Sequence, residues 1–227
     1  MEIIKAQDIY RTFVSGNITT HVLKGVSLDV QLGEFVAIMG KSGAGKSTFM
    51  YQLSILDHPT SGTIIINGTN TKELNEHEQT EFRLNTLGYI FQDYALVPDL
   101  SATENCMLPL LMKGEDWDKA KNKAVEMLTS VGLETRVDNL PSQLSGGEQQ
   151  RVAIARALAG NPKIIFADEP TANLDTISGN AIIDLLGELN KKGQTIVMVT
   201  HEEEYTKYCN RIVRMEDGKI IKEEVLR

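Results

Sequence analysis

Residues 36–48 read VAIMGKSGAGKST, and this stretch of the 227-residue chain decides the fold. Its first four residues are a continuous apolar run, the pattern of a strand that is covered on both faces in a parallel sheet. A glycine-rich turn follows, and the residues after it, STFMYQLSIL, have helical character. A strand, a loop and a helix in this order form the context that a phosphate-binding loop requires.

The turn fits the pattern G-x-x-x-x-G-K-[ST] with Gly40, Gly45, Lys46 and Ser47. Glycines let backbone N–H groups curl around phosphate oxygens, and a helix that begins near Lys46 adds the positive end of its dipole. We expect Lys46 to reach the β- and γ-phosphates and the Ser47 hydroxyl to ligate magnesium. The loop alone does not separate a kinase, a GTPase and a motor ATPase. The predicted nucleotide-binding loop comprises Gly40, Lys41, Ser42, Gly43, Ala44, Gly45, Lys46, Ser47 and Thr48.

Two more apolar runs, IIFA (164–167) and IVMV (196–199), predict further strands of the parallel sheet. Residues 2–9, 22–31 and 62–67 look instead like antiparallel strands. The chain therefore reads as an α/β nucleotide-binding core.

Residues 101 to about 158 are predicted to be mostly helical. Within them, apolar residues recur at three- and four-residue steps, which we interpret as a stripe that packs into a core rather than a ligand site. The stripe comprises Trp117, Ala120, Ala124, Leu128 and Val131. These helices would form a lobe inserted between the first and the later sheet strands.

Asp168 and Glu169 directly follow the apolar run 164–167. Two adjacent acids at the end of a buried strand are costly to bury without a function. We expect Asp168 to hold magnesium through water and Glu169 to polarise the attacking water as a general base. The competing interpretation is that Glu169 only caps or pairs at the surface.

Residues 144–149 read LSGGEQ, and the following QRVAIARAL is helix-like. Ser145 before two glycines is a helix-start signature that also presents N–H groups and a hydroxyl to an anion. By itself, this hexapeptide could be an ordinary capped helix.

Composition narrows the class of protein. The net charge of −8 argues against a broad nucleic-acid surface, because such surfaces neutralise phosphates with Lys and Arg. No stretch approaches the roughly 18 consecutive apolar residues of a membrane span, and the N-terminus lacks the pattern of a secretion signal, so we expect a cytoplasmic protein. Cys106 and Cys209 are far apart in sequence and are expected to be ordinary reduced thiols.

The glycine loop, LSGGEQ and the Asp-Glu pair occur in the order found in ATP-binding cassette (ABC) ATPases, and the chain resembles this family over nearly its whole length. The resemblance implies a P-loop NTPase (RecA-like) α/β core with an antiparallel β-subdomain and an inserted helical subdomain. It implies one domain over residues 1–227, with the core in 1–93 and 159–227 and the helical subdomain in 94–158. ATP and Mg²⁺ are the implied cofactors.

In this family LSGGEQ closes over ATP held by the other subunit of a head-to-tail homodimer. The resemblance therefore implies that Ser145 and Gly147 touch a γ-phosphate in trans, with Gly146 and Glu148 beside them. Asp175, in ANLD, resembles the D-loop aspartate that links the two sites across the dimer interface.

Three more positions carry over from the resemblance. Gln92, in YIFQD, is similar to the Q-loop glutamine that contacts magnesium and the attacking water, and His201, in VTH, is similar to the switch histidine that contacts the γ-phosphate. Phe13 falls where the family places an aromatic that stacks on adenine, and Tyr10 is the competing choice. The implied catalytic set is Lys46, Gln92, Glu169 and His201, and the implied metal ligands are Ser47, Gln92 and Asp168.

The chain departs from the family pattern in three places. Lys41 stands where proline is usual, which changes loop stiffness and adds charge near the phosphates. Ala172 replaces the commoner glycine before the D-loop, and Glu202 replaces the usual aspartate after the switch histidine. None of these changes removes a catalytic group.

The segments ENCMLPLL (104–111) and LDHPTSGTIIING (56–68) resemble the group that includes lipoprotein-releasing, macrolide-exporter and cell-division ATPases. Such a subunit would sit at the cytoplasmic face of the membrane beneath a separately encoded permease, whose cytoplasmic helices dock near the Q-loop and the helical lobe. The leading hypothesis is an ATPase for export or lipoprotein release. A mechanotransmission ATPase that regulates an extracytoplasmic enzyme is the alternative, and a soluble nucleic-acid-associated cassette is the third.

Overall fold

The first strands of the chain form an antiparallel sheet. In the computed structural model, which describes residues 1–226, β1 (Glu2–Ser15) pairs with β2 (Ile18–Gln31) and with β4 (Ser61–Ile66). A short β5 (Thr69–Asn70) completes the order β2-β1-β4-β5. The predicted antiparallel arrangement is confirmed, although β1 and β2 extend beyond the expected 2–9 and 22–31.

The second group of strands surrounds β3 (Phe35–Met39). Strand β3 pairs parallel with β8 (Thr195–Val199) and with β9 (Arg211–Glu216). Strand β10 (Lys219–Val225) pairs antiparallel with β9. Every residue of β3 and β8 is buried, which explains their continuous apolar runs. The predicted strands at 36–39 and 196–199 are therefore confirmed. The glycine loop leads from β3 into helix α1 (Lys46–Leu53).

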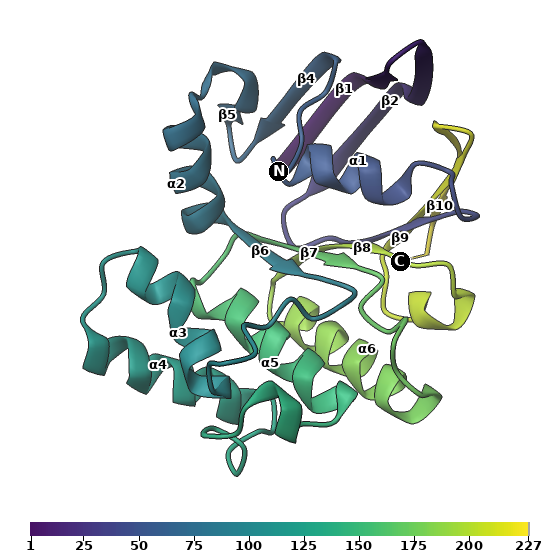
Figure 1. Cartoon of the computed structure of the whole chain (residues 1–227). Helices are drawn as coiled ribbons and strands as arrows, with labels where there is room; N and C mark the ends of the chain where they lie inside the picture. Colours follow the sequence, from purple (N-terminus) through teal and green to yellow (C-terminus); the bar gives the residue numbers. More distant parts are fainter. Residues whose placement is uncertain (227) are drawn as a thin grey trace. The chain divides into compact units, whose positions relative to one another are not determined.

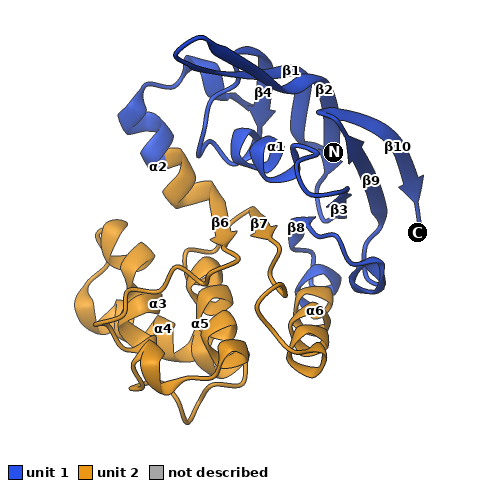
Figure 2. Ribbon diagram, turned by 45° about the vertical axis from the view of Figure 1, so that its right-hand side comes forward, with its two compact units in different colours: residues 1–81, 189–227 blue, residues 82–188 orange. Residues whose placement is uncertain are grey.

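Both groups of strands belong to one compact unit. Unit 1 comprises Met1–Glu81 and Leu189–Arg227, and unit 2 comprises Phe82–Glu188 (Figure 2). These boundaries are not those of the predicted core and helical subdomains, and that division stays a prediction. Helices α2 (Glu76–Thr86) and α6 (Thr176–Lys191) contain the points of division. The 3₁₀ turns η1 (Thr71–Glu73) and η3 (Glu203–Thr206) lie in unit 1.

Unit 2 combines two parallel strands with a group of helices (Figure 1). Strand β6 (Leu87–Ile90) pairs parallel with β7 (Ile164–Asp168), whose residues are all buried. The remaining elements are α3 (Ala102–Met112), α4 (Trp117–Ser130), the 3₁₀ turn η2 (Pro141–Gln143) and α5 (Gly146–Ala159). The prediction of a mostly helical stretch from 101 to about 158 is confirmed.

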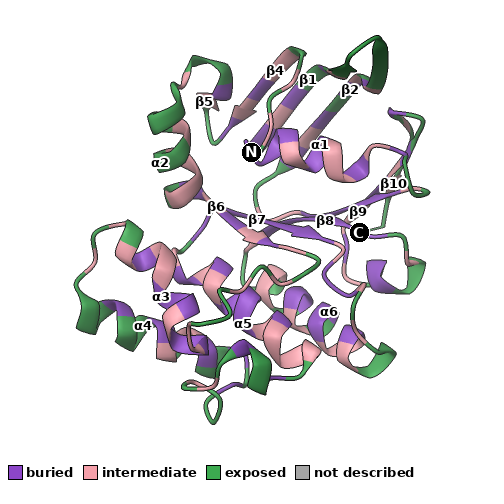
Figure 3. Ribbon diagram, in the orientation of Figure 1, coloured by how far each residue is buried: buried purple, intermediate pink, exposed green. Residues whose placement is uncertain are grey.

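Helix α4 buries most, but not all, of its predicted apolar stripe (Figure 3). Ala120, Ala124 and Leu128 are fully buried, and Val131 is 2% exposed. Trp117 is 55% exposed, so its assignment to the core is wrong. Periodicity assigns a face to a helix but does not show where the covering neighbours end, and Trp117 is the first residue of α4.

Both cysteines are buried thiols that form no disulfide, which agrees with the prediction of ordinary reduced thiols at Cys106 and Cys209. Burial raises the pKa of the Cys106 thiol to about 12, which keeps it protonated and unreactive. Over residues 1–226, no helix combines the length and apolar character that a bilayer crossing requires.

Candidate functional site

In unit 1, the side chain of Lys46 bonds back to the backbone of the glycine loop. Lys46, the first residue of α1, is only 6% exposed, and its ammonium donates a 3.2 Å hydrogen bond to the carbonyl of Lys41. No side chain caps the start of α1, because the position before Lys46 is Gly45. The first N–H groups of α1 and a buried cation therefore share one loop, which is the arrangement that binds phosphate.

The beginning of the loop needs glycine for space. A Cβ on Gly40 would lie 2.2 Å from the carbonyl oxygen of Met215, closer than any real contact. The side chains of Lys41 and Ser42 are exposed, so the middle of the loop faces outward. The loop thus offers its backbone to a ligand while its first residue packs against β9.

His201 lies at the same edge of the sheet as this loop. In the parallel β3–β8 ladder Ile38 is the partner of Val199, and the Thr200 amide donates to the Ile38 carbonyl at 3.2 Å. His201 therefore leaves β8 where Gly40 leaves β3. Ligands of α/β proteins bind at the carboxyl ends of parallel strands, so the predicted switch histidine is well placed.

The two candidate adenine-binding aromatics of β1 have different environments. Phe13 is 43% exposed, and the Arg11 guanidinium lies 4.3 Å from its ring centroid. Asp57 holds that guanidinium through two hydrogen bonds of 2.8 Å. Tyr10 instead lies against Gly25, where an added Cβ would be 2.8 Å from the tyrosine hydroxyl. Tyr10 is also 46% exposed, so exposure does not separate the two rings. The difference is that Arg11 supports one face of the Phe13 ring.

Unit 2 brings the predicted carboxylates and Gln92 to one edge of its strands. Ile90 and Ala167 are register partners in the parallel β6–β7 pair, so Gln92 and Asp168 follow neighbouring strand ends. Asp168 is 6% exposed. Glu169 has a φ of 42°, a left-handed conformation that costs a non-glycine residue about 1 kcal/mol or more. Strain of this kind is typical of functional sites.

LSGGEQ begins α5, with Ser145 as the predicted N-cap. The Ser145 hydroxyl accepts from the Glu148 amide at 3.3 Å, and the Glu148 carboxylate accepts from the Ser145 amide at 2.8 Å, a reciprocal capping box. A hydrogen bond from Arg136, and then those from Ser145, lower the pKa of Glu148 to about 2. Glu148 therefore supports the helix start while Ser145 stays exposed.

Buried and exposed hydrogen bonds connect the other segments of unit 2. Gln150, which is fully buried, donates from its side chain to the Pro170 carbonyl at 2.8 Å, linking α5 to the segment after Glu169. Asp175 accepts from the amide and the hydroxyl of Ser178 at 2.9 and 2.8 Å. The carboxylate of Asp175 thus caps the beginning of α6.

The predicted site residues are divided between the units. Unit 1 holds the loop 40–48, Phe13 and His201. Unit 2 holds the other predicted site residues: Gln92, Ser145, Gly146, Gly147, Glu148, Asp168, Glu169 and Asp175. The predicted metal ligands are split likewise, with Ser47 in unit 1 and Gln92 and Asp168 in unit 2. Residues 1–226 contain no cluster of three or more His, Cys, Asp or Glu side chains fit for a metal. A divalent cation here fits only as a companion of phosphate oxygens, the manner in which Mg²⁺ usually binds.

Some contacts of the site were not anticipated from the sequence. No sequence motif pointed to Arg11, which lies beside Phe13. No motif pointed to Asn173 either, whose side-chain amide donates to the Gln92 carbonyl at 2.9 Å. The turn at Asp217 and Gly218, which touches the glycine loop, did carry a signal, because Asp-Gly between two strand-like runs is typical of a hairpin.

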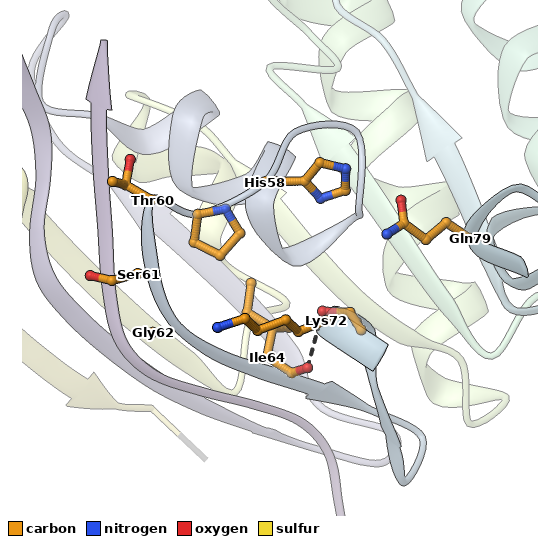
Figure 4. A pocket seen from close by; sticks show the side chains of 9 residues that line it. His58, Thr60, Ser61, Gly62, Ile64, Lys72 and Gln79 are labelled. Atoms are coloured by element: carbon orange, nitrogen blue, oxygen red, sulfur yellow. Dashed lines mark hydrogen bonds between the residues drawn. The ribbon is translucent and has the colours of Figure 1, made fainter. Parts of the chain in front are cut away.

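Cavities also lie outside the predicted site residues, among them one in each unit. One in unit 1, of about 190 Å³, has His58 and Lys72 in its lining, where the Thr71 hydroxyl donates to the Ile64 carbonyl at 3.1 Å (Figure 4). One in unit 2, of about 280 Å³, is mainly apolar. Its lining comes from α2, β6 and the segment after it, α3 and α5, and comprises Leu84, Leu87, Gly88, Tyr89, Phe91, Ala95, Leu108, Pro109, Met112, Arg156, Ala157 and Gly160.

Comparison with known proteins gives consistent matches. The ABC transporter family model matches residues 23–172. An uncharacterized ABC transporter ATP-binding protein of Methanocaldococcus jannaschii is 48% identical over 218 residues, covering 96% of this chain and 97% of that one. The lipoprotein-releasing system ATP-binding protein LolD of Aquifex aeolicus is 44% identical over 222 residues, covering 98% and 97%.

Other matches are to a longer protein and to a solved structure. The macrolide export ATP-binding/permease protein MacB of Chlorobium luteolum is 46% identical over 222 residues, and the chain covers 33% of its length. The chain thus spans about a third of the MacB relatives. The dimeric structure of an ATP-binding cassette in a post-hydrolysis state, bound to ADP and Pi, superposes with a TM-score of 0.92 at 42% identity, covering 99% of both chains.

Proposed function

The chain belongs to the ABC transporter family as an ATP-binding, ATP-hydrolysing subunit, and from this premise we propose that it powers a membrane permease in export or lipoprotein release. The observation that carries the proposal is the pair of anion-ready helix starts, one behind the Lys46 loop and one behind Ser145. An ATPase whose sites close only between two subunits needs both helix starts: one binds the ATP of its own chain and the other contacts the ATP of the second subunit.

The loop of unit 1 holds the ATP phosphates. Lys46 exchanges the Lys41 carbonyl for phosphate oxygens, so its charge is compensated by the ligand rather than by a backbone dipole. Phe13 stacks on adenine through the ring face that Arg11 leaves open, and the guanidinium over the opposite face supports this choice. Bound Mg²⁺ would neutralise charge on the phosphates, with Ser47, Gln92 and Asp168 as its protein ligands.

Hydrolysis is assigned to the strand ends of the two units. Glu169 takes a proton from the attacking water as general base, and its constrained left-handed backbone fixes where its carboxylate projects. Gln92 orients that water from the end of β6. His201 donates a hydrogen bond to the γ-phosphate from the end of β8, stabilising charge that develops during transfer.

The LSGGEQ helix serves a second subunit. Cassettes of this family form dimers, and the similar solved structure is a dimer bound to ADP and Pi. The Ser145 hydroxyl lies on an exposed helix start whose cap is completed by Glu148, which supports an approach to phosphate in trans. A Cβ on Gly146 would lie 2.9 Å from the Tyr94 hydroxyl, so the helix start needs glycine there for space. Asp175 would then connect the two sites across the interface.

The apolar cavity of unit 2 is the proposed docking place for the permease. It lies between the segment that follows β6, where Gln92 begins the Q-loop, and helices α3 and α5. Met112 on its rim is 66% exposed, an uncovered apolar side chain of the kind that an interface uses. A cytoplasmic helix of the permease seated there would place the chain peripherally on the membrane.

The docking proposal is tested with two matched substitutions. Met112→Glu should lower ATP hydrolysis stimulated by the permease while the basal rate stays within about twofold, since a charge opposes apolar burial. Trp117→Glu, on a position outside the cavity that is 55% exposed, should preserve stimulation. Equal behaviour of the two variants would reject this docking place.

Recovery of the membrane partner and a test of its activity distinguish transport from regulation of an extracytoplasmic enzyme. The decisive experiment is affinity purification of the chain from its own cells in detergent, followed by reconstitution with the recovered permease in vesicles. ATP-dependent movement of a small molecule, or extraction of a lipoprotein, supports the proposal if Glu169→Gln abolishes it. A reconstituted complex that hydrolyses ATP without moving either class would overturn the transport role.

A further inference from the structure

The hairpin of β9 and β10 ends in a two-residue turn whose residues both have positive φ. Asp217 has φ 46° and Gly218 has φ 76°, the combination that suits a tight hairpin between twisted strands. The turn contains none of the residues assigned above to ATP binding or hydrolysis. Its contacts are nevertheless directed at the glycine loop.

Both the amide and the carbonyl of Gly218 form backbone hydrogen bonds. Its amide donates to the carbonyl of Ala44, in the glycine loop, at 3.1 Å, and its carbonyl accepts from the Lys24 amide of β2 at 2.9 Å. A Cβ on Gly218 would lie 2.2 Å from the Val22 carbonyl oxygen. The turn therefore fits against β2 without spare room and holds Ala44 through one backbone hydrogen bond.

The same hairpin touches the start of the loop. The Met215 carbonyl, near the end of β9, packs against Gly40 so closely that no Cβ fits between them. A cavity of about 300 Å³ separates these two contacts, and its lining combines loop and hairpin: Gly40, Lys41, Ser42, Gly43, Ala44, Arg214, Met215, Glu216, Asp217 and Ile221. The hairpin thus contacts the loop at Gly40 and at Ala44 and leaves residues 41–43 between them exposed.

We infer that the turn at Asp217 and Gly218 is a positioning element for ATP binding: it holds the carbonyl of Ala44 and thereby keeps the loop amides turned toward phosphate. The inference rests on the proposed role of the loop. Because coupling between two sites is reciprocal, ATP binding must in turn stabilise the hydrogen bond from Gly218.

The chain contains a matched control for Gly218. Asn67 and Gly68 form the turn between β4 and β5, also in unit 1, with φ values of 48° and 79°. A Cβ on Gly68 would meet nothing within 4 Å. Gly218→Ala and Gly68→Ala therefore add the same backbone strain, but only Gly218→Ala forces a neighbour to move.

The test compares ATP affinity and melting temperature in both variants. We expect Gly218→Ala to weaken ATP binding, measured by calorimetry with Mg²⁺, by about tenfold, the fold-change of an overpacked contact. Gly68→Ala should bind ATP within about twofold of the unmodified chain. ATP affinity that is equal in the two variants would overturn the inference, whatever their melting temperatures.

A measurement on the unmodified chain keeps the inference testable if Gly218→Ala does not fold. Hydrogen exchange of the Gly218 amide should slow by about tenfold or more when ATP is added. The Asn67 amide, which donates to the Ile3 carbonyl at 2.7 Å in the control turn, should change less. Equal changes at the two amides would contradict the inference, whereas a chain that binds no ATP at all would instead contradict the proposed function.

Discussion

The side-chain amide of Asn173 donates a 2.9 Å hydrogen bond to the main-chain carbonyl of Gln92, across 81 positions of sequence. Gln92 follows β6, and Asn173 stands two residues before Asp175. The hydroxyl of Tyr94, in the same segment as Gln92, donates to the Asn173 carbonyl at 3.5 Å. The segment assigned to sense the permease is thus bonded to the segment assigned to the dimer interface.

Asn173→Asp removes this donor without changing side-chain volume. Since one hydrogen bond contributes about 1 kcal/mol, we expect stimulation of ATP hydrolysis by the permease to fall about fivefold. Asn180→Asp is the control, because the Asn180 amide donates to Thr176 within its own helix. Steady-state ATPase rates with and without permease give the answer, and unchanged stimulation in Asn173→Asp would show that the bond does not couple the segments.

Phe13 and Tyr10 can be separated by affinity. Base stacking on an aromatic contributes about 1–3 kcal/mol, so Phe13→Ala should weaken ATP binding by about tenfold or more. Tyr10→Ala should leave the affinity for ATP within about threefold, because Tyr10 packs against Gly25. Titration of a fluorescent ATP analogue measures both, and the reverse order of effects would transfer the adenine site to Tyr10.

Substitutions of the two lysines of the glycine loop should have very different effects on ATP affinity. Lys46→Ala removes the buried ammonium and should weaken ATP binding about 10- to 100-fold, the range for hydrogen bonds to charged groups. Lys41→Ala removes the same charge from an exposed side chain and should cost less than about threefold. Normal ATP affinity in Lys46→Ala would refute the assignment of this loop to the phosphates.

Acid should weaken the start of α5 through Glu148. A hydrogen bond from Arg136 lowers the pKa of Glu148 to about 2 from its ordinary 4.5. A carboxyl whose folded pKa is lowered stabilises the fold above its unfolded pKa, and this stability is lost as the pH falls from about 4.5 toward 2. Glu148→Gln should flatten this part of the pH profile of the unfolding free energy relative to the unmodified chain. Parallel profiles for Glu148→Gln and the unmodified chain would exclude the effect.

The sequence predicted those features that depend on neighbouring residues. The strand at 36–39, the start of α1 at Lys46 and the Ser145 cap are local patterns of apolarity, glycine and hydrogen-bonding side chains. The left-handed backbone of Glu169 gave no such signal, because an Asp-Glu-Pro sequence does not specify φ.

Contacts between distant segments were beyond prediction for a different reason. The hydrogen bond from Gly218 to Ala44 involves backbone atoms alone, so no residue type reveals it. Exposure of Trp117 depends on where other helices end, which periodicity within α4 does not contain. Strand β10 is half exposed and rich in charges, so its sequence lacked the apolar run that identified β3.

The central claim is that the catalytic unit is a dimer, with ATP held by one chain and LSGGEQ supplied by the other. Glu169→Gln should retain ATP binding but not hydrolyse it, so ATP should trap the closed dimer. The most direct measurement is sedimentation equilibrium of this variant with and without ATP. We expect a shift to twice the 25.1 kDa of one chain when ATP is added, and a species of 25.1 kDa with ATP bound would rule out the dimeric site.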